Sequence, residues 1–295
     1  MNDQGLLIDK ARAYLNELCV GIGERSVGCE GNRRATAFFR DELKALGWAV
    51  EAHEFSAVDW AGGGAALSAG GERFDVRSSP YSLGFSGKAR LACASCVEEL
   101  ERGGLGGKIL LLHGPIAAEQ LMPKNFVFYS PEEHRRVVAL LENSGALALV
   151  CATGRNSALA GGAYPFPLIE DGDFDVPSVY MTEEEGKRLL AHAGKEVSLE
   201  SDAKRLPAAG YNVIGTKGAA GAKRIVVTAH IDAKKGTPGA IDNATGVAVL
   251  LLVAEFLKDY GGGRLVEIVA FNGEDYYAVP DRKSTRLNSS HTDIS

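Results

Sequence analysis

The sequence predicts an α/β protein with a mostly parallel open sheet, flanked by helices and interrupted by an inserted β-rich module. Three observations support this fold class. Residues 223–231 (KRIVVTAHI) form a continuous apolar segment, which is typical of a strand buried on both faces of a parallel sheet. An apolar helical segment at 242–260 and a second apolar strand at 264–275 follow, so the three segments form a βαβ unit. Between residues 59 and 207 the sequence becomes rich in Gly and Ala and dense in turns, which indicates a separate module.

The first 58 residues contain three predicted elements. Apolar residues recur at helical spacing within residues 6–19, and residues 30–47 form a second amphipathic helix. Gly47 lies where a glycine commonly ends a helix. Residues 48–55 then alternate between apolar and polar side chains, as in a half-buried strand.

The inserted module reads mainly as short strands with a few helices. Thr182 and Glu185 form a T-x-x-E capping box that predicts the start of a helix. The predicted strands are 107–114, 146–153 and 176–181, and the predicted helices are 131–145 and 183–194.

These segments divide the chain into four parts. Residues 1–58 and 208–280 form the two halves of the main domain, and residues 59–207 form the insertion. The last segment, 281–295 (DRKSTRLNSSHTDIS), has no apolar period and is rich in Ser and Arg, so we expect a non-native tail. His291 and Asp293 lie in that tail and are not expected to be ligands.

Composition excludes several functional classes. The chain has 45% hydrophobic and 24% charged residues with a net charge of −6, which is typical of a globular protein that does not bind nucleic acid. No segment predicts a membrane span. The sequence after Met1 does not resemble a secretion signal, so the chain as written is expected to be cytoplasmic, with secretion left open if the N-terminus is incomplete. Cys93 and Cys96 form a lone C-x-x-C, which we interpret as packed small residues rather than a zinc or redox motif.

Ionisable side chains gather at the ends of the βαβ unit. The cluster consists of His230, Asp232, Asp242, Glu274 and Asp275. Both strands of such a unit end at one edge of the sheet, where open α/β sheets bind ligands. Several carboxylates so close together repel one another unless a cation offsets their charge, and zinc accepts both imidazole and carboxylate ligands.

Each motif also has a simple structural interpretation. The H-x-D at His230 can be a surface turn, Asp242 can cap the helix, and Glu274 with Asp275 can be an ordinary loop. The joint placement of these residues favours the metal interpretation. Because adjacent side chains of an extended backbone point apart, we expect one of Glu274 and Asp275 to ligate and the other to act as a general base.

Three segments carry a resemblance to a known family. The stretches AHIDAKKGTPGAIDNATGVA (229–248) and VAFNGED (269–275), with GERSVGCEGNRRATAFFRDELKALGW (23–48), resemble the di-zinc aminopeptidases of the M28 type. The inserted module 59–207 resembles the protease-associated (PA) domain that many members carry.

The resemblance implies a role for each residue of the cluster. His230 would bind one zinc ion, Asp242 would bridge two zinc ions, and Asp275 would bind the second. Glu274 would be the catalytic general base, and Asp232 would orient His230. The implied reaction is hydrolysis of N-terminal peptide bonds, with peptides as substrates and two Zn²⁺ as cofactors.

The resemblance stops before the family's last two ligands, an Asp and a His that lie further downstream. We therefore expect the chain to be C-terminally truncated and inactive as a fragment. Two alternatives remain open: a metal-dependent amidohydrolase that acts on acyl-amino substrates, and a non-catalytic, peptidase-like binding scaffold. Oligomeric state, metal identity and substrate preference do not follow from the sequence.

Overall fold

A computed structural model describes residues 3–122, 129–154, 174–219 and 223–275. The chain folds as two compact units: the first unit comprises residues 1–59 and 207–295, and the second comprises residues 60–206. The boundaries expected from the sequence lie after residues 58 and 207, and those of the two units lie after residues 59 and 206.

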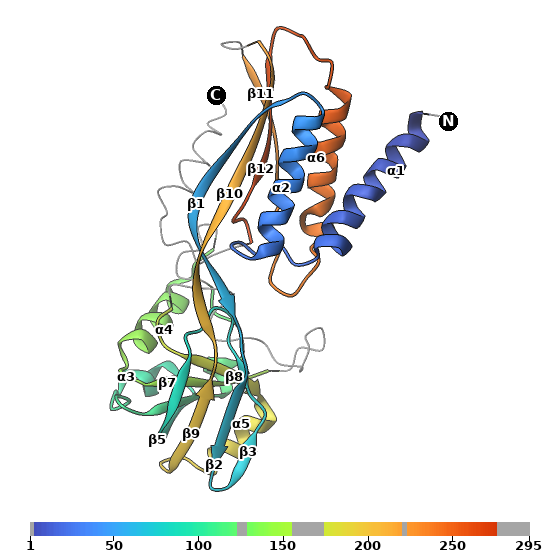
Figure 1. Ribbon diagram of the computed structural model, residues 1–295. Helices are drawn as coiled ribbons and strands as arrows, with labels where there is room; N and C mark the ends of the chain where they lie inside the picture. Colours follow the sequence, from blue (N-terminus) through green and yellow to red (C-terminus); the bar gives the residue numbers. More distant parts are fainter. Residues whose placement is uncertain (1–2, 123–128, 155–173, 220–222, 276–295) are drawn as a thin grey trace. The chain divides into compact units, whose positions relative to one another are not determined.

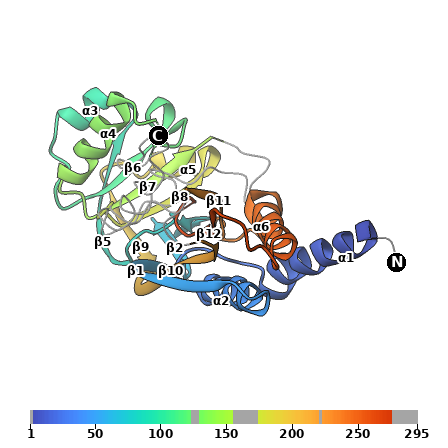
Figure 2. The same ribbon diagram turned by 90° about the horizontal axis from the view of Figure 1, so that it is seen from above.

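The first unit contains a four-stranded sheet with the strand order β1-β10-β12-β11. Helices α1, α2 and α6 lie together on one side of these strands (Figure 1, Figure 2). In chain order the elements are α1 (Asp3–Asn16), α2 (Glu30–Ala45), β1 (Ala49–Ala61), β10 (Lys204–Gly218), β11 (Arg224–His230), α6 (Thr245–Phe256) and β12 (Leu265–Phe271).

Helix α2 shows why the helices pack on this face. Its buried residues Ala35, Phe39 and Leu43 recur every four positions, so they form one apolar stripe. The stripe joins a core that also includes Leu251 of α6 and residues of the sheet. The helix ends before Gly47, which has a φ of +72°, so the predicted terminal glycine is confirmed.

The predicted α/β class, its flanking helices and its βαβ unit are confirmed. Strands β11 and β12 pair in parallel, with α6 between them in the sequence. The sheet is nevertheless mixed rather than mostly parallel, since β10 pairs with β12 in the antiparallel direction. The connection from β10 to β11 covers only residues 219–223, and so short a connection joins oppositely directed strands because a parallel pair needs a crossover of a dozen or more residues.

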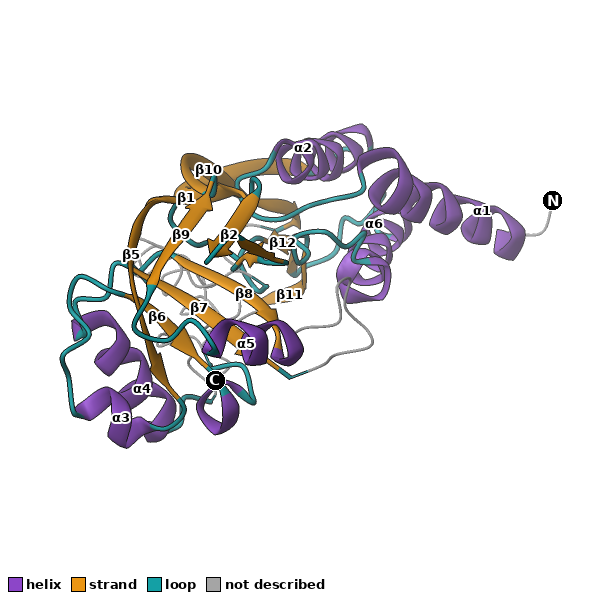
Figure 3. Cartoon of the chain, turned by 90° about the horizontal axis from the view of Figure 1, so that it is seen from below, coloured by secondary structure: helices purple, strands orange, loops and turns teal. Residues whose placement is uncertain are grey.

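The second unit contains an eight-stranded sheet with the order β3-β2-β9-β5-β6-β7-β8-β4. Its central pairs, β5 with β6, β6 with β7, and β7 with β8, are parallel. The elements are β2 (Ala65–Ala69), β3 (Glu72–Phe74), β4 (Arg77–Ser78), β5 (Phe85–Ala94), α3 (Val97–Glu101), β6 (Ile109–Leu112), α4 (Glu132–Asn143), β7 (Ala148–Thr153), β8 (Ser178–Thr182), α5 (Glu183–Leu190) and β9 (Glu196–Ser201) (Figure 3).

Strand β6 is buried on both faces, as its apolar sequence predicts. Leu110 and Leu112 join a core formed with α3 and α4, while Ile109 and Leu111 join a second core formed with α5. The start of α5 also agrees with the sequence, because the hydroxyl of Thr182 accepts a hydrogen bond from the backbone N–H of Glu185.

Three further expectations bear on the whole chain. All five cysteines are free, including Cys93 and Cys96 of the C-x-x-C. Among the described residues, no helix has the length and apolar character needed to cross a membrane. The predicted non-native tail, 281–295, lies outside the described residues.

Candidate metal centre

Strands β11 and β12 bring the cluster together at one edge of the sheet. His230 is the last residue of β11 and pairs with Phe271, the last residue of β12. The backbone N–H of Ile231 donates to the carbonyl of Phe271 at 2.7 Å, so the two chains stay side by side as they leave the sheet. Residues 274 and 275 therefore emerge next to the segment that follows His230.

Three side chains converge closely enough to share one cation. Ligand atoms of His230, Glu274 and Asp275 all lie within 4.8 Å of one another. The imidazole Nε2 of His230 lies 3.8 Å from Oε2 of Glu274 and 2.9 Å from Oδ1 of Asp242. Asp242 thus contacts the cluster through His230, and 71% of its side chain is exposed.

Glu274 and Asp275 both reach this cluster. The expected division into one ligand and one general base stays a prediction, but the extended backbone assumed for it, from which adjacent side chains point apart, is not observed. The chain instead turns after β12, where Gly273 has a φ of +101°. Glu274 is mostly exposed while Asp275 is buried, so the two carboxylates approach His230 from different depths.

Asp232 lies beneath the cluster and is fully buried. Its Oδ2 accepts a hydrogen bond from the backbone N–H of Asp275 at 3.0 Å, and its backbone carbonyl lies 3.2 Å from Nδ1 of His230. Its Oδ1 is 3.6 Å from the same Nδ1 and has no hydrogen-bond partner among the described residues. Asp232 therefore faces one side of the imidazole and leaves Nε2 directed at the other carboxylates.

The electrostatics of the cluster reflect its crowding. Burial lowers the pKa of His230, but the hydrogen bonding and charge of Asp232, with the charges of two further carboxylates, outweigh it and raise this pKa to about 9. Burial raises the pKa of Asp275 to about 6; the positive charge of nearby Lys234 opposes this shift, and the other carboxylates add to it. The cluster thus holds more negative charge than its one imidazole can offset.

The donor set fits a divalent metal ion. One imidazole nitrogen and several carboxylate oxygens are ligands that zinc accepts, and the unpaired buried oxygen of Asp232 marks an excess of acceptors over donors. The described part of the chain supplies His230, Asp242, Glu274 and Asp275 as candidate ligands.

Residues of the N-terminal segment support the site, and the sequence analysis assigned them no role. The guanidinium of Arg25 is fully buried and binds the segment that follows β11. The side chain of Asn272 accepts from Asn32 at 2.6 Å, which fixes the chain just before Glu274. Arg25 and Asn32 lie in the stretch 23–48 that carries part of the family resemblance, and that was the one signal available.

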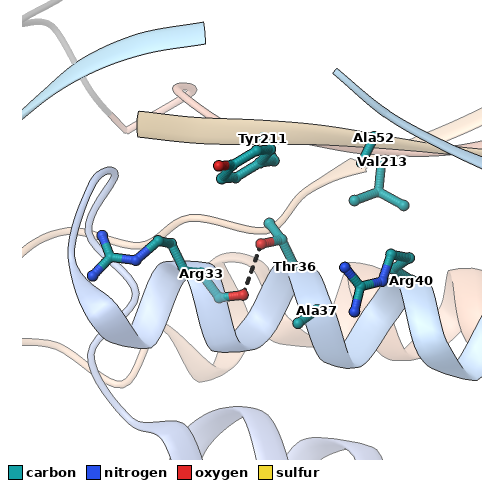
Figure 4. A pocket seen from close by; sticks show the side chains of 7 residues that line it. All are labelled: Arg33, Thr36, Ala37, Arg40, Ala52, Tyr211 and Val213. Carbon is teal, nitrogen blue, oxygen red and sulfur yellow. Dashed lines mark hydrogen bonds between the residues drawn. The ribbon is translucent and has the colours of Figure 1, made fainter. Parts of the chain in front are cut away.

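A pocket of about 310 Å³ lies elsewhere in the first unit, between α2 and strands β1 and β10 (Figure 4). None of the cluster residues lines it. Its charged and hydroxyl groups already have protein partners, since Arg40 pairs with Asp41 and the Tyr211 hydroxyl donates to Glu54 at 2.8 Å. Its lining consists of Arg33, Thr36, Ala37, Arg40, Ala52, Tyr211 and Val213.

Sequence comparison relates the chain to a class of metallopeptidases. Residues 212–292 match Peptidase family M28, and this range includes every residue of the cluster. This match confirms the resemblance noted for the stretches 229–248 and 269–275. The relatives include aminopeptidase YwaD of Bacillus subtilis strain 168, with 22% identity over 90% of this chain, and a probable lipoprotein aminopeptidase, LpqL, of Mycobacterium tuberculosis, with 26% identity over 79% of it.

Solved structures show that the fold is that of known aminopeptidases. An aminopeptidase from Aneurinibacillus sp. strain AM-1 superimposes with a TM-score of 0.69 and 21% identity, covering 97% of this chain and 66% of its own. BSAP, a zinc aminopeptidase from Bacillus subtilis, gives a TM-score of 0.64 and 22% identity over 90% of this chain and 61% of its own. The chain spans about half the length of its curated relatives, 54% of YwaD and 45% of LpqL.

Proposed function

We propose that the chain carries the metal-binding core of a zinc-dependent aminopeptidase, and that the complete protein hydrolyses N-terminal peptide bonds. The observation that carries this proposal is the convergence of His230, Glu274 and Asp275 at the ends of two parallel strands. The family match over residues 212–292 and the aminopeptidase names of the relatives support it.

In this proposal the site would hold two zinc ions. His230 and Asp275 would each hold one of the ions, and Asp242, near the start of the following helix, would be shared by both. Asp232 keeps the imidazole oriented from its Nδ1 side. Bound zinc would polarise the carbonyl of the scissile peptide bond and make a water molecule easier to deprotonate.

Glu274 is the proposed general base. About 60% of its side chain is exposed, so a water molecule has access to its carboxylate, and Oε2 lies 3.8 Å from the ligand nitrogen of His230. The carboxylate takes a proton from the attacking water and gives it to the departing amine. Asp275 is less suited to this role because it is buried, which limits the access of water to its carboxylate.

We also propose that residues 59–207 form a PA-like module. The similarity to the Aneurinibacillus aminopeptidase covers 97% of this chain and so includes the second unit, which supports a module shared with that enzyme. The sheet of the second unit is consistent with the β-rich character on which the sequence expectation rested.

The proposal is tested by assaying the complete protein with aminoacyl anilides and with their N-acetylated forms. We expect cleavage of the free-amine substrates only, loss of activity with a chelator, and a fall in kcat of about 10²–10⁴ for Glu274→Gln. Glu51→Gln, an exposed carboxylate on β1, is the matched control and should retain full activity. Preferential cleavage of the acetylated substrates would favour the amidohydrolase alternative. Absence of metal-dependent hydrolysis would favour the binding scaffold.

The 295-residue chain is assayed in parallel, because we propose that it is inactive on its own. Hydrolysis by this chain at the rate of the complete protein would refute that expectation while leaving the proposed activity intact.

A further inference from the structure

The segment Ile231–Gly239 joins β11 to the turn that carries Asp242, so its shape sets the distance between His230 and Asp242. It contains no helix or strand and begins at the edge of the sheet. A segment of this kind needs partners outside itself to keep a fixed shape, because loop backbone has few hydrogen bonds of its own.

The buried side chain of Arg25 supplies three of these partners. Its side chain is fully buried, although arginine is rarely so without paired charges or many hydrogen bonds. All three guanidinium nitrogens donate to backbone carbonyls of this unit. The acceptors are Leu18 at 2.9 Å, Gly23 at 3.2 Å, Ile231 at 3.0 Å, Pro238 at 2.6 Å and Gly239 at 3.0 Å.

Three of these five acceptors belong to the first and last residues of the segment. The guanidinium therefore ties Ile231 to Pro238 and Gly239. Its bonds to Leu18 and Gly23 tie all three to the segment that follows α1. Only arginine offers so many donors in one rigid plane, since lysine presents its donors from a single point.

Gly239 shows that the segment closes tightly on the guanidinium. Its φ is +49°, and a Cβ at this position would lie 2.8 Å from Nη2 of Arg25 and 2.4 Å from Cβ of Ala233. A larger residue would force the chain away from Arg25. The close contact between the backbone of residue 239 and the guanidinium therefore requires glycine at position 239 as well as arginine at position 25.

Glu24 holds the same segment from its outer side. Its carboxylate pairs with Lys235 at 3.0 Å and accepts a hydrogen bond from the backbone N–H of Gly236 at 3.2 Å. The backbone carbonyl of Arg25 also accepts from the N–H of Ala233 at 3.3 Å. Two consecutive residues thus hold the segment from two sides.

We infer that Arg25 is a positioning residue, which fixes the segment Ile231–Gly239 and thereby the spacing between His230 and Asp242. The inference rests on the proposed metal site for its functional meaning, although the order of the segment is measured without any metal. It assigns a role in the site to a residue that would itself contact neither metal nor substrate.

The test compares Arg25→Lys with the wild-type chain and with Arg40→Lys, an exposed control on α2 that pairs with its neighbour Asp41. Hydrogen exchange of the metal-free chain is followed by mass spectrometry over residues 231–244. We expect Arg25→Lys to speed exchange there on the order of tenfold, with the remainder of the first unit unchanged and Arg40→Lys like wild type. Unchanged exchange in this segment would overturn the inference.

Zinc affinity is the second measurement. We expect Arg25→Lys to bind zinc about 10–100-fold more weakly, as is typical when a group that supports metal ligands is altered. Equal zinc affinity in Arg25→Lys and wild type would overturn the inference. If the wild-type chain binds no zinc, the proposed metal site fails, while hydrogen exchange still decides the role of Arg25.

A variant that loses its fold is also informative. Global unfolding of the first unit by Arg25→Lys would contradict the inference, since it would assign Arg25 to the fold rather than to the segment. Arg25→Ala with added guanidinium ion is a further measurement. Restoration of slow exchange in residues 231–244 supports the inference, and failure of guanidinium to slow that exchange counts against it.

Discussion

The substitution Asn272→Ala should destabilise the first unit, because the Asn272 side chain connects β12 to two other segments. It is buried; its Nδ2 donates to the backbone carbonyl of Tyr211, and its Oδ1 accepts from Asn32 at 2.6 Å. Alanine removes both bonds and leaves the carbonyl of Tyr211 without this partner. The backbone N–H of residue 272 keeps its bond to Asn212, at 2.8 Å.

The magnitude follows from these bonds. A net hydrogen bond contributes about 0.5–1.5 kcal/mol, and a buried polar group left unpaired costs about 1–3 kcal/mol. We therefore expect Asn272→Ala to lower the free energy of unfolding of the first unit by about 2–4 kcal/mol. Because Glu274 and Asp275 follow Asn272 after the single residue Gly273, the same change should weaken zinc binding.

Urea denaturation measures this loss. Trp48 is buried in the first unit and Trp60 lies in the second, so a Trp60→Phe background leaves Trp48 as the reporter. Asn143→Ala removes an exposed side-chain bond at the end of α4 and should change stability by less than about 0.5 kcal/mol. An Asn272→Ala transition that coincides with wild type would refute the argument that these bonds hold β12.

The remaining predictions address packing, charge and capping. Leu251→Ala on α6 should cost about 2–5 kcal/mol in urea denaturation, because the side chain is fully buried; a cost below 1 kcal/mol would show that the site collapses or is not in the core. Burial raises the pKa of Glu24, but the hydrogen bond and charge of Lys235 outweigh burial and lower this pKa. The ion pair therefore stabilises the fold at neutral pH, and its contribution is lost as the pH falls through the lowered pKa of Glu24. Glu24→Gln should remove that acid dependence at a cost of less than about 1 kcal/mol, since the pair is partly exposed; an unchanged pH profile of the urea midpoint would argue against the pair. Thr182→Ala should lower the stability of the second unit by about 1 kcal/mol in thermal denaturation, and no loss would mean that the cap is not formed in solution.

Much of the first unit could be predicted from the sequence because its segments are long and strongly patterned. The apolar runs at 223–231 and 264–275 leave few alternatives to buried strands. A parallel pair then requires both carboxyl ends at one edge, so the gathering of His230 with Glu274 and Asp275 follows from topology alone.

The antiparallel direction of β10 was harder to predict from the sequence. It depends on the short connection at 219–223 and on the long insertion that separates β1 from β10, and neither leaves a periodic signal. The side chains of Glu274 and Asp275 both come close to His230 because of the backbone at Gly273. Its positive φ breaks the alternation of an extended chain.

The proposed role of Arg25 left no periodic or compositional signal, and only the family resemblance of the stretch 23–48 pointed to this region. An arginine next to a glutamate is typical of an exposed surface. The carbonyls of Ile231 and Pro238, which accept hydrogen bonds from Arg25, lie 206 and 213 positions away in the sequence. Burial of such a residue follows from the tertiary fold, which brings those carbonyls to it. Sequence patterns therefore predicted the residues that gather in the cluster and missed Arg25 and Asn32, which contact the neighbouring backbone.

The most direct test of the central claim is an anomalous difference map at the zinc edge, from crystals of this chain grown with zinc. We predict a peak within bonding distance of Nε2 of His230 and the carboxylates of Glu274 and Asp275, absent in His230→Ala. A map without a peak there, or with the same peak in His230→Ala, would contradict the claim that this cluster is a metal centre.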